Sequence, residues 1–261
     1  MSDLHPTISE FIKSNFDPQM ESRFFGWILL ANSSYKATNP HRLDDLNAAA
    51  LPLIREIPER PLEILDVAVS SGISTQEWYE QLVDGGIETR LTGTDAVVNA
   101  FRLKMGPADC LLDKDQHVIH LSLFEKAIKP KVVKWLRPCG LNLAFRMAAK
   151  LGRKPDSFPL VSRAVKDVAV VEEDMESENE NERSRFHVIR AANILNLVYL
   201  PEERLQRVVK LLLRRLRPNG LFIVCRTNED GSNHASIFQF DGERLTLRHR
   251  LGSGSEIEYL L

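Results

Sequence analysis

The segment Leu62–Gly72 reads LEILDVAVSSG and constrains the fold more than any other part of the chain. An apolar run that ends in an acid predicts a buried strand, and the small residues after it predict a tight loop. Ser74 and Glu77 have the spacing of a capping box and predict a helix start. This order of strand, small-residue loop and helix start is typical of nucleotide-binding units, in which a ligand approaches the loop backbone and the helix N-terminus.

The composition is that of a globular protein with a sizeable core, since 43% of its 261 residues are hydrophobic and 27% are charged. A formal net charge of −2 gives no overall attraction to nucleic acid. The three cysteines have no CxxC spacing, which fits a reducing cytoplasm and argues against a zinc site. We therefore expect a cytoplasmic protein without a metal site, a nucleic-acid partner or a membrane span.

Strands and helices alternate along the chain from residue 62 onward. Strands are predicted at 62–68, 90–96, 168–171, 186–192 and 221–225, and helices at 75–83 and after Pro201. Asp241-Gly242 predicts a hairpin between the runs 235–240 and 244–250. This pattern predicts an α/β fold with a Rossmann-like, doubly wound, mostly parallel sheet that ends in an antiparallel C-terminal edge hairpin.

Two regions lie outside this alternation. Residues 1–60 are predicted to be helical, with one helix near 42–55 and a polar loop at 32–40, and to form an N-terminal helical lid or simply to pack. Residues 97–167 are predicted to be an insertion, with a hairpin around Asp113–Gln116 followed by basic helices. We expect a cap over 1–60 and a cofactor-binding domain over 61–261, in which the insertion 97–167 covers the substrate side.

Charge is distributed unevenly over the second half of the chain. Basic residues outnumber acids in 125–166, and apolar residues alternate with them. Such a segment indicates either a solvated helix face or, over 125–151, a weak contact with a membrane surface. Residues 172–182 hold seven acids and no bases, which predicts a solvated loop.

In combination, the motifs resemble those of class I S-adenosylmethionine-dependent methyltransferases. The matching segments, in the order of that family, are Leu65–Gly72, Gly93–Asp95, Val170–Met175, Phe186–Leu195 and Leu216–Gly220. The resemblance covers roughly 60–100 and 168–261 and leaves the insertion unmatched. It implies a Rossmann-like domain that uses S-adenosylmethionine as methyl donor or as substrate.

The resemblance also implies roles for individual residues. The loop Ala68, Ser70, Ser71 and Gly72 would lie against the amino-acid part of the cofactor, with Asp66 orienting its methionine end. Asp95, followed by Ala96, would accept hydrogen bonds from the ribose hydroxyls. The adenine would be contacted by Glu173 or Asp174, which accept from its amino group, and by Met175, which packs against the ring.

No residue identifies itself as an acid or base catalyst. Methyl transfer is often an in-line displacement that depends mainly on proximity and orientation, so a general base is not obligatory. Asn193 follows the fourth predicted strand and would lie beside the reacting carbon. The other catalytic candidates are Tyr35 in the polar N-terminal loop and Tyr199 near the fourth strand.

One departure from the family concerns the loop after the first strand. Ala68 and Ser70 stand where the family usually has glycines. Because these residues do not readily adopt positive φ, we expect the loop to use conformations open to ordinary residues.

Three functions remain open at this stage. The first is a methyltransferase acting on a small or lipid-like molecule, such as one of secondary metabolism. The second is a cyclase or lyase of the same fold, in which the amino group of S-adenosylmethionine attacks its own γ-carbon to give azetidine-2-carboxylate and methylthioadenosine. The third is a non-catalytic binding protein.

Overall fold

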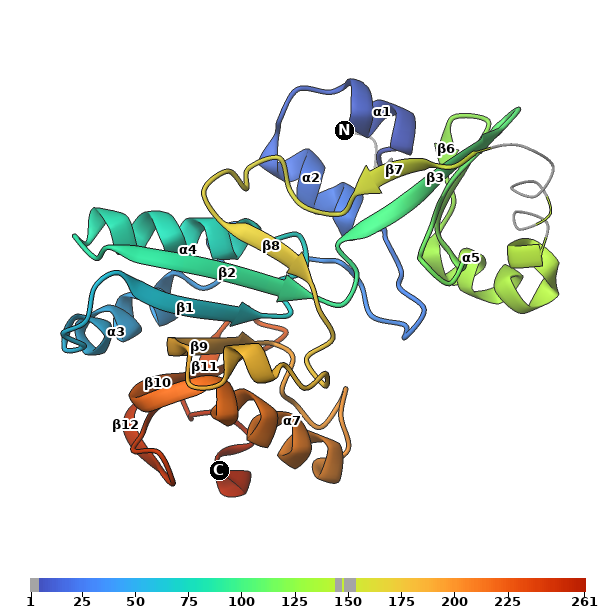
Figure 1. The fold of residues 1–261 in the computed structure, drawn as a ribbon. Coiled ribbons are helices and arrows are strands. Elements are labelled where there is room, and N and C mark those ends of the chain that lie inside the picture. Colours follow the sequence, from blue (N-terminus) through green and yellow to red (C-terminus); the bar gives the residue numbers. More distant parts are fainter. Residues whose placement is uncertain (1–4, 144–146, 148–153) are drawn as a thin grey trace. The chain divides into compact units, whose positions relative to one another are not determined.

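The computed structural model describes residues 5–143, 147 and 154–261. The chain divides into two compact units (Figure 1). The smaller unit contains 1–40 and 97–164, and the larger unit contains 41–96 and 165–261. Of the helices in the first 60 residues, α1 (Ile8–Lys13) and α2 (Pro18–Phe25) belong to the smaller unit and α3 (Asp44–Arg55) to the larger.

The larger unit is built on a seven-stranded sheet with the order β12-β11-β10-β9-β1-β2-β8. The strands are β1 (Leu62–Val67), β2 (Thr89–Asp95), β8 (Ala169–Glu172), β9 (Phe186–Ala192), β10 (Leu216–Thr227), β11 (Asn233–Phe240) and β12 (Leu245–Leu251). Pairing is parallel from β8 to β10, whereas β11 runs antiparallel to both β10 and β12. The predicted Rossmann-like α/β class with an antiparallel C-terminal edge is confirmed.

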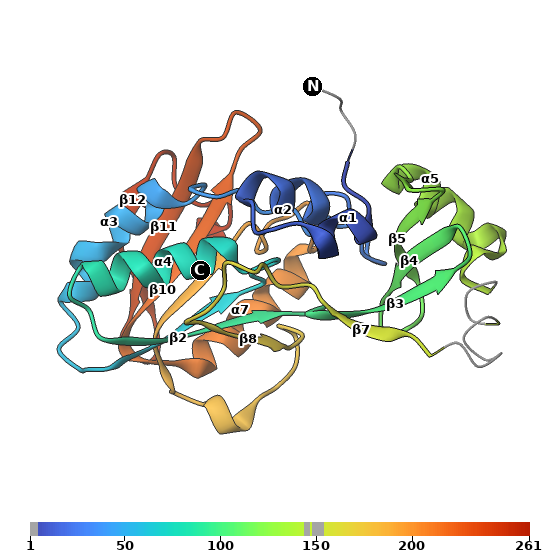
Figure 2. The same ribbon diagram turned by 90° about the horizontal axis from the view of Figure 1, so that it is seen from above.

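Helices cover both faces of this sheet, which makes it doubly wound. Leu62 and Ile64 of β1 belong to a core with residues of α3 and of α4 (Ile73–Asp84), and these two helices pack together (Figure 2). Leu65 and Val67 belong to a second core with the apolar side of α7 (Glu202–Arg215). Successive β1 residues therefore face opposite helical layers, as expected for a central parallel strand.

Pro218–Gly220 lies inside β10, whose register against β9 shifts between Leu216 and Leu221. Asn219 adopts a φ of +66°, a conformation that asparagine tolerates better than most residues. A Cβ on Gly220 would lie 2.8 Å from the Arg217 carbonyl oxygen, so only glycine fits there. An irregularity inside a strand thus has the sequence pattern of a turn.

The smaller unit contains a five-stranded antiparallel sheet in the order β6-β5-β4-β3-β7. Its strands are β3 (Asn99–Met105), β4 (Ala108–Leu112), β5 (Val118–Leu123), β6 (Lys126–Ala127) and β7 (Asp156–Pro159). The predicted hairpin corresponds to β4 and β5, whereas β3 and β7 were not predicted. Among the predicted basic helices, α5 (Pro130–Leu136) and a π-helical turn (Arg137–Leu141) are present, and 144–146 and 148–153 lie outside the described residues.

Aromatic side chains of α1 and α2 form the core on one face of this sheet. Phe11 stacks on Phe24 with ring centroids 4.0 Å apart, and both approach Phe158 of β7. Glu21, which is buried, pairs with Arg163 at 2.6 Å. None of the described helices is long and apolar enough to cross a bilayer.

Candidate functional site

The loop between β1 and α4 adopts a left-handed backbone at alternate positions. The φ angles are +57° at Ala68, +60° at Ser70 and +79° at Gly72. The expectation that alanine and serine would avoid this region is therefore wrong. The reason is a tight reversal held by backbone hydrogen bonds, in which the Val69 N–H donates to Thr94 O and the Gly72 N–H to Val69 O. Each non-glycine residue in this region costs about 1–2 kcal/mol.

The start of α4 also differs from its predicted form. Gly72 is the N-cap and Ile73 the first helical residue, and no side chain caps this helix. Ser74 is buried in the first turn, while the Glu77 carboxylate accepts the N–H of His41 at 3.0 Å. The predicted capping box is wrong, because the left-handed glycine starts the helix two residues before Ser74 and places Glu77 against another segment.

Asp95 lies at the carboxyl end of β2 and holds the loop in place. Its Oδ2 accepts the N–H of Ser70 at 2.8 Å, and its carbonyl accepts the N–H of Glu173 at 2.9 Å. The ends of β2 and β8 and the β1–α4 loop therefore meet at Asp95, with Ser71 buried in the loop and Ala96 next along the chain. The structure thus brings the predicted residues 68–72, 95 and 96 together with the backbone of Glu173.

Asp66 has a different environment from the one that the resemblance implies. It is 3% exposed, and its two carboxylate oxygens accept from Arg190 Nε and Nη2 at 2.9 and 2.6 Å. The Thr75 hydroxyl donates to the same carboxylate at 2.7 Å. Arg190 also donates to Asn47 Oδ1 at 2.7 Å and stacks on the Trp78 ring at 3.9 Å. Asp66 is therefore the anion of a buried, fully bonded ion pair in the sheet.

Arg190 and its neighbour Arg42 were not predicted as site residues. A signal was available for Arg190, because a charge inside the otherwise buried strand β9 needs a buried partner. Burial lowers the pKa of Arg42, Arg190 lowers it further, and Asp66 and Glu77 oppose that shift. Arg42 Nε is buried without a hydrogen-bond partner among the described residues.

The acidic segment after β8 pairs mainly with α7. The Glu173 carboxylate accepts from Arg215 at 2.5 Å, and Arg215 is only 4% exposed. Asp174 is exposed and its carboxylate accepts the N–H of Glu176 at 3.0 Å, which forms a local turn. Met175 packs on the same apolar core as Ala68. Of the predicted adenine-contacting residues, Met175 thus shares its packing environment with the loop.

The three catalytic candidates lie in different surroundings. Asn193 has a φ of +62°, and its side chain bonds Thr227 twice, accepting the backbone N–H at 2.6 Å and donating to the hydroxyl at 3.0 Å. This amide therefore ties the end of β9 to the end of β10. Tyr199 is 55% exposed in the loop that follows, and Tyr35 is 43% exposed in the smaller unit, where it pairs with Leu29.

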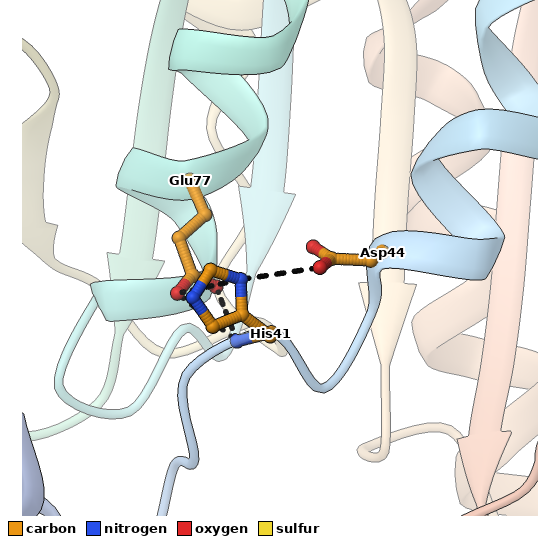
Figure 3. Close-up of side chains that lie close together, drawn as sticks. All are labelled: His41, Asp44 and Glu77. Atoms are coloured by element: carbon orange, nitrogen blue, oxygen red, sulfur yellow. Dashed lines mark hydrogen bonds and ion pairs between the residues drawn. The ribbon is translucent and has the colours of Figure 1, made fainter.

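Two groups of side chains offer three possible metal ligands each among the described residues. The first is His41, Asp44 and Glu77 in the larger unit (Figure 3). The second, in the β4–β5 hairpin of the smaller unit, is Asp113, Asp115 and His117. In each group the possible donor atoms lie within 4.8 Å of one another.

Comparison with known proteins gave matches among solved structures alone. No protein-family model matches the sequence, and neither does any curated protein. The citrinin polyketide synthase CMeT domain has 17% identity and a TM-score of 0.38, over 72% of this chain and 35% of that chain. The plantazolicin methyltransferase BpumL in complex with SAH has 14% identity and a TM-score of 0.37, over 72% and 48%.

A third similar structure is the [4+2]-cyclase SpnF, with 16% identity and a TM-score of 0.34 over 73% of this chain and 47% of that chain. The present chain matches less than half of the length of each of these three chains. The fold class of the larger unit follows from its own strand order and pairing.

Proposed function

We propose that the larger unit binds S-adenosylmethionine at the carboxyl ends of β1 and β2, and that the protein is a methyltransferase acting on a small or lipid-like metabolite. The observation that carries this proposal is the left-handed backbone at positions 68, 70 and 72. Two of these positions lack glycine, so the conformation is maintained at an energetic cost. A loop shaped for the close approach of a ligand to its backbone accounts for that cost.

Different residues around the loop would bind different parts of S-adenosylmethionine. The N-terminus of α4 and the loop backbone would face the carboxylate of the methionine part, where the helix dipole favours an anion. A carboxylate has about four acceptor sites, so Asp95 would hold Ser70 and also accept from the ribose. Met175 would pack against the adenine, with Glu173 and Asp174 near its amino group.

The buried ion pair changes the proposed role of Asp66. Its oxygens are engaged by Arg190 and Thr75, so it would act on the methionine end by fixing β1 and α4 and not by direct contact. Bound S-adenosylmethionine supplies the electrophilic methyl group. The chain would contribute orientation and the exclusion of water. Asn193 would act by shaping the end of β9, and Tyr199 remains a proposed acceptor-side group of the larger unit.

A specific observation also favours the non-catalytic alternative. The side chains of Asp66, Glu173 and Asn193 all form hydrogen bonds with other residues of this chain. A binding protein that had lost catalysis would keep the sheet and use these groups for its own stability.

Incubation with S-adenosylmethionine alone and with candidate acceptors tests the reaction. We expect S-adenosylhomocysteine to form only when an acceptor is present, with methylation of that acceptor detected by mass spectrometry. If methylthioadenosine forms without an acceptor, the reaction is cyclisation and methyl transfer is contradicted. Binding of the cofactor without any turnover across a broad set of acceptors would favour the non-catalytic protein.

A further inference from the structure

His41, Asp44 and Glu77 come together where the chain enters α3 and crosses α4 (Figure 3). His41 Nδ1 lies 3.1 Å from Asp44 Oδ2 and 4.0 Å from Glu77 Oε1. The side chains of the three residues are 76%, 45% and 15% exposed, in that order. The cluster is therefore open to solvent on the His41 side and enclosed on the Glu77 side.

These separations suit a small divalent ion. Donor atoms that each lie about 2.0–2.2 Å from one ion are about 3–3.5 Å apart from one another. The pair His41 Nδ1 and Asp44 Oδ2 already has this spacing. Separations within the cluster reach up to 4.8 Å, so the Glu77 carboxylate would have to turn toward the other two donors, a movement that a side-chain torsion allows.

Residues around the cluster fix two of the three donors. Gln81 Nε2 donates to Asp44 Oδ1 at 2.8 Å, which leaves Oδ2 toward His41. The backbone N–H of His41 binds both oxygens of Glu77 at 3.0 Å and sets the direction of that carboxylate. Such supporting hydrogen bonds are typical of the residues that orient metal ligands.

We propose that His41, Asp44 and Glu77 bind one divalent transition-metal ion, of which Zn²⁺ fits one imidazole and two carboxylates best. Water would complete a four-coordinate shell on the exposed side. The ion would join the segment before α3 to α4, the helix that begins at the β1–α4 loop. This proposal does not depend on cofactor binding.

Two conservative variants of the 261-residue chain test the site. His41→Asn removes the imidazole but keeps a residue that tolerates the φ of +60° at this position. Glu77→Gln removes a charge but keeps an oxygen that can accept the His41 N–H. The matched control is His117→Asn, which alters the hairpin cluster, where His117 Nδ1 lies 3.1 Å from Asp113 Oδ2.

Metal-free protein is titrated with Zn²⁺ by calorimetry, and circular dichroism establishes that each variant is folded. We expect saturable binding that weakens by about tenfold or more in His41→Asn and Glu77→Gln, equivalent to at least ~1.4 kcal/mol, and that persists in His117→Asn. Mn²⁺ should broaden the NMR signal of the His41 ring, identified by its loss in His41→Asn. Equal Zn²⁺ affinity in the wild type and both variants, no saturable binding by the wild type, or an unbroadened His41 signal would each overturn the proposal.

Discussion

At the residue scale, the β1–α4 loop has a backbone conformation that its residue types do not predict. Ala68 and Ser70 adopt left-handed angles that their side chains disfavour, because hydrogen bonds from Val69 and to Asp95 leave the loop little choice. The sequence predicted the position of this loop but not its conformation. A preference of about 1–2 kcal/mol per residue is small enough for tertiary hydrogen bonds to override.

Relief of this strain gives a direct prediction. Ser70→Gly should raise the free energy of unfolding by about 0.5–1 kcal/mol, because glycine adopts positive φ without steric cost but loses more chain entropy on folding. Ser71 is not among the residues with positive φ, so Ser71→Gly should lower stability instead. Urea denaturation of both variants measures the difference. A loss of stability in Ser70→Gly as large as in Ser71→Gly would show that the loop is unstrained.

A second residue-scale prediction concerns His120 in the smaller unit. Burial lowers the pKa of His120 to about 4, an effect that Asp109 opposes, and both ring nitrogens lack hydrogen-bond partners among the described residues. Below about pH 6.5 the His120 ring becomes protonated in the unfolded chain, whereas in the folded protein it stays neutral down to about pH 4. The free energy of unfolding should therefore fall by up to about 3 kcal/mol between pH 6.5 and 4, with no contribution from His120 above that range.

The variant His120→Phe isolates this effect, because the ring lies against Phe24 with centroids 5.3 Å apart and a phenyl group can replace it. Chemical denaturation between about pH 4.5 and 7.5 should show a shallower acid dependence in this variant. Identical slopes in the wild type and His120→Phe would contradict the assignment.

At the scale of elements, the sequence patterns predicted the positions of most strands. They did not predict two strands of the smaller unit or the contacts of the acidic segment with α7. The β9 prediction of 186–192 has the observed bounds, and the β4–β5 hairpin is where its turn residues indicated. β7 was missed because it has only four residues with no clear alternation and pairs with β3 across more than fifty residues. β3 was missed although it also forms a local hairpin with β4, in which Met105 pairs with Ala108. The acidic segment predicted to be a solvated loop is largely exposed, and it is also bonded to α7, as in the ion pairs of Glu176 with Arg204 and Arg207.

The pairing of β1 with β9 through Asp66 and Arg190 gives the element-scale prediction. Removing one partner of a buried ion pair leaves an uncompensated charge, so Arg190→Met should destabilise the protein by about 3–5 kcal/mol. The double variant Arg190→Met with Asp66→Asn should recover much of that loss. Arg185→Met, which removes surface ion pairs with Glu63 and Glu182, should change stability by about 0–1 kcal/mol. Equal unfolding midpoints for Arg190→Met and Arg185→Met would show that the buried pair contributes little.

At the scale of the whole molecule, the sheet of the larger unit brings residues from distant segments to one place. Asp95 of β2, the loop after β1 and the chain after β8 share hydrogen bonds at the carboxyl ends of parallel strands, where ligands of α/β proteins bind. The resemblance to class I S-adenosylmethionine-dependent methyltransferases implied this meeting. It could not predict that Arg190 and Arg215 neutralise two of the expected acids, because each of these contacts joins side chains far apart in sequence.

Titration calorimetry of the protein with S-adenosylmethionine and S-adenosylhomocysteine tests the central claim most directly. We predict saturable binding that Asp95→Ala weakens by about 1–3 kcal/mol through the loss of hydrogen bonds to a charged acceptor. The control Arg185→Met should bind as the wild type does. Absence of affinity for both ligands, or equal affinity in the wild type and a folded Asp95→Ala variant, would contradict the proposed cofactor site.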